Sequence, residues 1–225
     1  MTEADWLAET DLNRLLSFAE PRLSPRKARL LTAALCRAVG LPKHHPDFLA
    51  ALDVIERHAD GLATSVELDD ARQRCRVLAI QQFEDSARSA GVTQGALAII
   101  QSELAWAVAF AATTPLSVEA VGRRVLETTH PSYADVLTDA CRRRRRTVAG
   151  NPFRPVSFDP AWRTRTAVAL AGQMYESRDF GAMPILADAL QDAGCTSDDI
   201  LDHLRDPELT HVRGCWVLDG VLEKG

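Results

Sequence analysis

Residues 195–216 read Cys195-Thr-Ser-Asp-Asp-Ile-Leu-Asp-His203-Leu-Arg-Asp-Pro-Glu-Leu-Thr-His211-Val-Arg-Gly-Cys215-Trp216. Thr196 is a residue type that caps helices, and it predicts a short helix over 197–205. Asp206-Pro207 interrupts that helix, because proline cannot continue the helical hydrogen-bond pattern. A last helix is expected from about Thr210 to Glu223. The stretch therefore predicts two short helices joined by a brief linker.

The same pattern of caps and apolar stripes extends along the rest of the chain. Thr2, Asp11, Ser24 and Ser117 each precede a helical apolar stripe, and Thr64 with Glu67 has capping-box spacing. Further helices are predicted at about 11–20, 25–39, 47–60, 64–90, 93–113, 117–129, 132–148, 160 onward and 183–192. Val, Ile and aromatic residues never alternate over five positions, so no strand is predicted. We expect an all-α fold: an irregular multi-helix bundle or array of about ten helices without significant sheet.

Residues 150–160 carry three prolines in eleven positions and interrupt the helical pattern. They predict a boundary between an N-terminal helical bundle, 1–149, and a C-terminal helical module, 150–225, packed together as one unit. Four large aromatic side chains are expected to be structural and to pin this connector to the last helix. They are Phe153, Phe158, Trp162 and Trp216.

The composition points to a cytoplasmic protein. The 225 residues carry a net charge of -5, which argues against a general nucleic-acid surface. The acidic start lacks the pattern of a secretory signal, and five scattered cysteines favour reduced thiols. The most apolar window, 95–113, is interrupted by Gln101, Ser102 and Glu103, so a buried helix is expected there and no membrane span.

Several segments resemble a family of uncharacterised bacterial proteins that is abundant in planctomycetes. The likeness is carried by 1–7, 59–64, 150–156, 159–162, 184–190, 193–195 and the His211-Val-Arg-Gly-Cys-Trp216 motif. It is specific in the last third of the chain and loose in the middle. The resemblance implies a shared C-terminal module and no known activity. The segment before Gly150 departs from it, since that segment is usually apolar in the family and is Arg142–Arg146 here.

Cysteines and histidines concentrate in the opening stretch. Cys195, His203, His211 and Cys215 are separated by seven, seven and three residues. Two thiolates and two imidazoles form a plausible tetrahedral zinc set, and His211 and Cys215 would share one face of a helix. The alternative is that the cysteines are small buried side chains and that the histidines form caps or hydrogen bonds. A third hypothesis is a catalytic thiol at Cys215, with His211 one turn away and Arg213 lowering its pKa.

The second candidate site consists of five consecutive arginines near the end of a predicted helix: Arg142, Arg143, Arg144, Arg145 and Arg146. Guanidinium groups bind phosphate well, so nucleic-acid or polyanion binding is one hypothesis. A consecutive run, however, covers all sides of a helix. The alternative is a solvated helix end whose charge complements the helix dipole.

The sequence contains none of the common nucleotide-binding, metalloprotease or hydrolase motifs. We therefore expect a non-enzymatic, intracellular protein that binds a protein partner through helical faces and has no cofactor. The first alternative is a zinc-binding or thiol-dependent protein using the four cysteine and histidine residues above. The second is polyanion binding through the arginine run.

Overall fold

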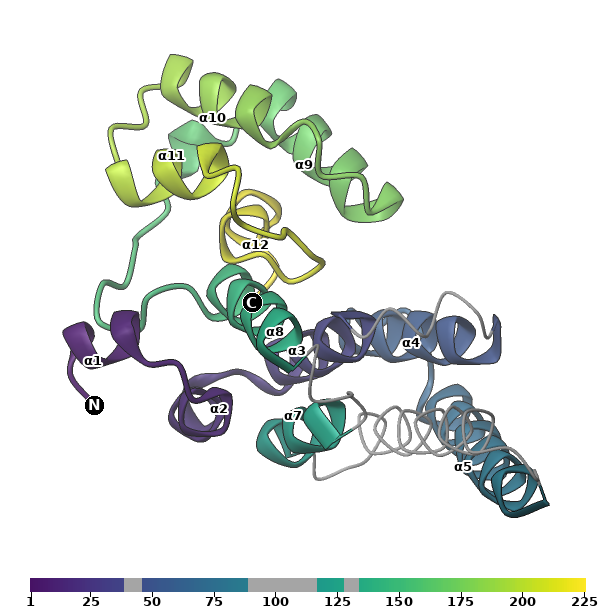
Figure 1. Cartoon of the computed structure of the whole chain (residues 1–225). Helices are drawn as coiled ribbons and strands as arrows, with labels where there is room; N and C mark the ends of the chain where they lie inside the picture. Colours follow the sequence, from purple (N-terminus) through teal and green to yellow (C-terminus); the bar gives the residue numbers. More distant parts are fainter. Residues whose placement is uncertain (39–45, 89–116, 128–133) are drawn as a thin grey trace. The chain divides into compact units, whose positions relative to one another are not determined.

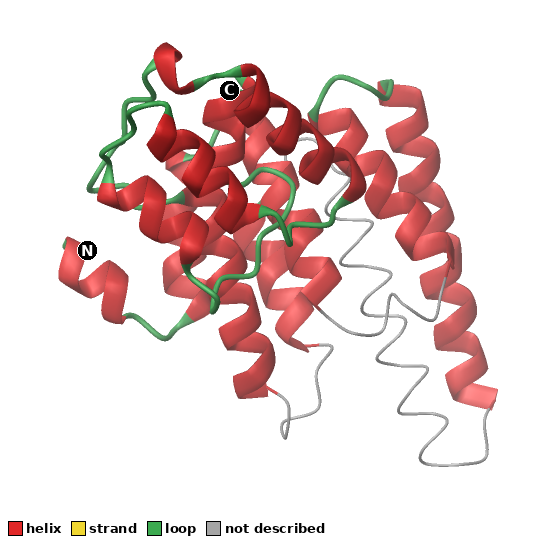
Figure 2. Ribbon diagram, turned by 90° about the horizontal axis from the view of Figure 1, so that it is seen from above, coloured by secondary structure: helices red, strands yellow, loops and turns green. Residues whose placement is uncertain are grey.

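The structure is a computed structural model that describes residues 1–38, 46–88, 117–127 and 134–225. Within these residues it is all-α, as predicted, and contains no strand (Figures 1 and 2). The α-helices are α1 (Glu3–Ala8), α2 (Leu12–Ala19), α3 (Pro25–Ala38), α4 (Pro46–Ala59), α5 (Ser65–Arg88), α7 (Val118–Glu127), α8 (Ala134–Ala149), α9 (Arg165–Ser177), α10 (Met183–Asp192), α11 (Asp198–Arg205) and α12 (Trp216–Leu222). The described ranges also contain the 3-10 turns η1 (Glu20–Arg22) and η4 (Pro160–Trp162).

Local capping sets where several helices begin. Thr2 and Asp5 form a reciprocal capping box, with backbone-to-side-chain distances of 3.2 and 2.8 Å. Thr64 and Glu67 form the second, at 3.2 and 2.7 Å. Side-chain oxygens satisfy backbone N–H groups that no helical carbonyl reaches, so these helix starts were predictable from sequence. The expected cap at Ser132 and the apolar window 95–113 lie outside the described residues.

The chain divides into two compact units, Met1–Arg142 and Arg143–Gly225. In the first unit α3 packs on both α4 and α7, α5 packs on α4, and α2 packs on α7. The residues of α3 from Ala28 to Cys36 are all buried, which makes α3 a core helix of this unit. Ion pairs also join α3 to α4 and to the residue that follows α4: Arg37 Nε lies 2.7 Å from Glu56 Oε1, and Arg26 Nε lies 2.9 Å from Asp60 Oδ1.

The boundary lies within α8, earlier than the predicted boundary after residue 149. The last turns of α8 belong to the second unit because they bond to the segment that follows α11. Arg143 Nη1 lies 2.7 Å from Glu208 Oε2, and Thr147 Oγ1 donates to the Thr210 carbonyl over 3.1 Å.

Besides the end of α8, the second unit contains α9, α10, α11 and α12. Contacts join α9 to α12, α9 to α10, α10 to α11, and α11 to α12. One apolar core joins all four helices. Phe158, Trp162 and Trp216 are partly buried and pack against it. A Cβ added to Gly220 would lie 2.7 Å from the Phe158 ring, so α12 presents bare backbone to that aromatic residue.

Phe153 differs from the other three aromatics, because its side chain is 37% exposed and lies outside this core. Its N–H donates to Asn151 Oδ1 over 3.0 Å, forming a local turn of the kind that asparagine stabilises. Phe153 is therefore not a buried core residue, and its expected role in pinning the connector to the last helix stays a prediction.

Three predicted helix starts need correction. Asp159 caps only the turn η4, and α9 begins separately after Thr164, whose Oγ1 accepts from Ala167 N–H over 3.2 Å. The N-cap of α11 is Ser197 and not Thr196. The last helix begins at Trp216 and not near Thr210.

Candidate metal centre

His203 is carried on the buried face of α11. Ile200, Leu201 and Leu204 on the same helix are buried in the core of the second unit. His203 itself is 9% exposed. The apolar neighbours fix the helix on the core and thereby hold the imidazole ring inside the unit.

His211 and Cys215 lie on a turn, so the prediction of a shared helical face was wrong. The N–H of Cys215 donates to the Val212 carbonyl over 3.1 Å, and Gly214 has φ +85°. Glycine adopts this left-handed conformation at little cost, which allows the chain to fold back before α12. Cys215 is then the N-cap residue of α12 and is fully buried.

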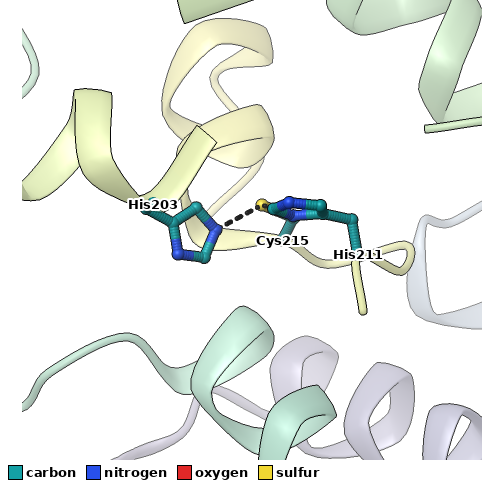
Figure 3. Close-up of side chains that lie close together, drawn as sticks. All are labelled: His203, His211 and Cys215. Carbon is teal, nitrogen blue, oxygen red and sulfur yellow. Dashed lines mark hydrogen bonds between the residues drawn. The ribbon is translucent and has the colours of Figure 1, made fainter. Parts of the chain in front are cut away.

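The turn brings three of the four predicted ligands together (Figure 3). His203 Nε2 lies 3.2 Å from Cys215 Sγ, and His211 Nδ1 lies 3.9 Å from the same sulfur. The two imidazole rings meet edge to face with centroids 5.1 Å apart. One ligand atom from each residue lies within 4.8 Å of the others, so this group, the His2Cys cluster, could hold a metal ion.

Cys195 is not part of the His2Cys cluster. It follows Gly194, which has φ +92°, and its N–H donates to the Leu190 carbonyl over 2.9 Å at the end of α10. This turn directs Cys195 into the apolar core, where it is 1% exposed. The predicted four-ligand set therefore reduces to three, and the alternative of a small buried side chain describes Cys195.

Burial controls the charge of His211. Desolvation lowers the pKa of its imidazole to about 4, and the carboxylate of Asp206 opposes this shift. The ring is consequently neutral at pH 7, which is the form that binds metals.

Trp216 makes a polar contact with the cluster that sequence reasoning missed. Its indole Nε1–H donates to His203 Nδ1 over 3.1 Å, with ring centroids 5.0 Å apart. From the sequence, Trp216 was expected only to pack against its neighbours. Its position directly after Cys215 was the available signal, but the partner ring lies thirteen residues away on another helix.

The guanidinium of Arg213 is held by residues of α9. Its Nε donates to the Tyr175 carbonyl over 2.8 Å, and its Nη2 lies 2.9 Å from Glu176 Oε2 on α9. The expectation that Arg213 lowers the pKa of Cys215 is therefore not supported by the geometry. Full burial of the Cys215 thiol also argues against an accessible nucleophile.

The arginine run does not form a uniform solvated surface. Arg145 is only 1% exposed, and the side chains of Arg142, Arg143, Arg144 and Arg146 are half-buried. Arg143 is held by the carbonyl and carboxylate of Glu208. Arg145 is thus buried in the protein, and Arg143 is bound to Glu208. Fewer arginines of the run are therefore available to bind a polyanion.

Comparisons of the chain with protein-family models, curated proteins and solved structures found no match. Among the helices in the described ranges, none is long and apolar enough to cross a membrane. The class that fold and site define is an all-helical protein whose C-terminal unit carries a largely buried group of two histidines and a cysteine.

Proposed function

We propose that the C-terminal unit binds one zinc ion through His203 Nε2, His211 Nδ1 and Cys215 Sγ. The observation that carries this proposal is the convergence of the three ligand atoms within 4.8 Å. Zinc–nitrogen and zinc–sulfur bonds of about 2.0–2.1 and 2.3 Å place tetrahedral ligands about 3.3–3.7 Å apart. The two nitrogen–sulfur separations, 3.2 and 3.9 Å, bracket this range. All three ligand atoms lie within 4.8 Å of one another, so the side chains must draw together around the ion.

The ion would link α11 to the turn that precedes α12. His203 comes from the helix, while His211 and Cys215 come from the turn. Three protein ligands leave a fourth position for water or another ligand. Because the site requires the folded unit, metal binding adds to the free energy of unfolding of that unit.

The experiment is a zinc titration in competition with a chromogenic chelator, combined with thermal unfolding. Zinc is expected to bind with one-to-one stoichiometry and to raise the Tm of the second unit. Cys215→Ser is expected to lose both effects. Cys195→Ser is the matched control, since it removes an equally buried thiol outside the cluster. Equal loss in both variants, or no binding by the wild-type protein, would contradict the proposal.

Protein–protein interaction is a second candidate, supported by one face of α5. Val66, Val77 and Ile80 are 71%, 52% and 49% exposed. Their spacing of eleven and three residues places them on the same side of the helix.

The simplest protein–protein interaction through this face is self-association of the chain, and sedimentation velocity tests it. A concentration-dependent dimer that dissociates in a Val77→Lys, Ile80→Lys variant would support it, whereas a wild-type monomer throughout would remove it.

A further inference from the structure

The indole of Trp216 constrains where the ring proton of His203 resides. An indole N–H can only donate, so His203 Nδ1 must accept with its lone pair over the 3.1 Å contact. A neutral imidazole carries one proton, which therefore lies on Nε2. That N–H is directed at Cys215 Sγ, 3.2 Å away.

This arrangement conflicts with metal binding at the same nitrogen. A metal-bound histidine offers a lone pair to the ion and usually donates its other N–H to an acceptor. Here the other nitrogen faces a donor. If His203 bound zinc through Nε2, its proton would move to Nδ1, and two N–H groups would then point at each other.

We infer that Trp216 is a gate for the zinc site: its indole holds His203 in the Nε2–H form in the metal-free protein and must leave Nδ1 when zinc binds. This inference rests on the proposed function. In the binding step zinc forms bonds to Nε2, Nδ1 of His211 and Sγ, and loses water ligands. The Cys215 thiol proton passes to solvent, while the His203 proton passes from Nε2 to Nδ1.

The gate also connects the cluster to the end of α8. A Cβ added to Gly150 would lie 3.3 Å from Cδ1 and Cγ of Trp216, so the indole lies directly on the Gly150 backbone. Gly150 has φ +63°, and its N–H donates to the Arg146 carbonyl over 3.0 Å at the end of α8. Displacement of the indole therefore changes the packing at the point where α8 ends.

The test follows the indole N–H signals of the full-length wild-type protein by NMR during a zinc titration. The chain has four tryptophans, and the signal missing from a Trp216→Phe spectrum identifies Trp216. Zinc is expected to shift the Trp216 indole signal most strongly. The ring nitrogens of His203 are expected to change from the Nε2–H to the Nδ1–H form.

Trp216→Phe supplies an affinity test, because it removes the N–H and keeps an aromatic ring. The Trp216→Phe variant has one neutral hydrogen bond fewer to break in the metal-free state. It is therefore expected to bind zinc about three- to tenfold more tightly than the wild-type protein. Trp162→Phe is the matched control in the same core and is expected to bind like the wild type. Zinc binding with an unmoved Trp216 indole signal would overturn the gate alone. Absence of zinc binding in the chelator competition would overturn the proposed function and the gate together.

Discussion

The indole Nε1–H of Trp216 donates to Nδ1 of His203 over 3.1 Å. This bond joins α12 to α11 and gives the imidazole a defined tautomer in the metal-free protein. A residue expected only to pack therefore makes a polar contact with the His2Cys cluster.

Because the pKa of His211 is lowered in the folded protein, we expect the zinc-free protein to lose stability in mild acid. Its pKa is about 4 in the folded protein and 6.5 as an ordinary imidazole. Between these values the unfolded chain binds the additional proton, so stability is complete above pH 6.5 and falls as the pH drops towards 4. The contribution is at most about 3 kcal/mol.

Chemical denaturation in chelator at pH 7.0, 5.5 and 4.5 measures this effect. His211→Gln is the comparison, since it removes the titrating group and keeps a polar side chain. The variant is expected to show a weaker dependence on pH over this range. An unchanged slope would assign the acid sensitivity to other groups.

Adding a single methyl group at Gly150 is expected to lower the free energy of unfolding. Gly150→Ala places Cβ against the Trp216 indole and forces alanine into the left-handed region, so a loss of about 1–3 kcal/mol is expected. Gly172→Ala is the control, because Gly172 lies in α9 with nothing within 4 Å of its added Cβ. It is expected to stabilise by up to about 1 kcal/mol. Similar changes in both variants would argue against tight packing at Gly150.

The five cysteine thiols of the native protein are expected to react slowly with thiol reagents. None of the five cysteines forms a disulfide, and none is more than 1% exposed. Burial raises the pKa of Cys75 to about 12, which further suppresses the reactive thiolate. An aromatic disulfide reagent is expected to react slowly with native zinc-free protein and rapidly with all five thiols in denaturant. A single fast thiol that disappears in Cys215→Ser would restore the catalytic-thiol hypothesis.

Within the arginine run, Arg145 is expected to have a structural role because it is buried. It is 1% exposed, so Arg145→Met is expected to cost about 1–3 kcal/mol by disturbing a buried polar group. Arg143→Met removes a half-exposed pair with Glu208 and is expected to cost less than about 1 kcal/mol. Denaturation of both variants measures the difference. Neutral stability with loss of heparin binding in Arg145→Met would instead favour the polyanion hypothesis.

The parts of the fold that were predictable from sequence depend on neighbouring residues. Thr64 and Glu67 form their capping box within one turn, so their spacing was sufficient. The turn before α12 was not predictable in this way. Gly214 permits the left-handed conformation, but the anchoring of Arg213 on Tyr175 depends on a distant helix. Cys195 was wrongly included among the metal ligands for a related reason. Its spacing in the sequence does not show that its side chain packs in the apolar core.

X-ray absorption at the zinc edge of the zinc-loaded wild-type protein identifies the ligands of the bound ion. We expect one sulfur ligand at about 2.3 Å and two imidazole nitrogens at about 2.0–2.1 Å. The imidazole contribution is expected to fall when His211 is replaced by Ala, and the sulfur contribution to persist in Cys195→Ser. Two sulfur ligands, no sulfur ligand, or no retained zinc would contradict the assignment of His203, His211 and Cys215 as the zinc site.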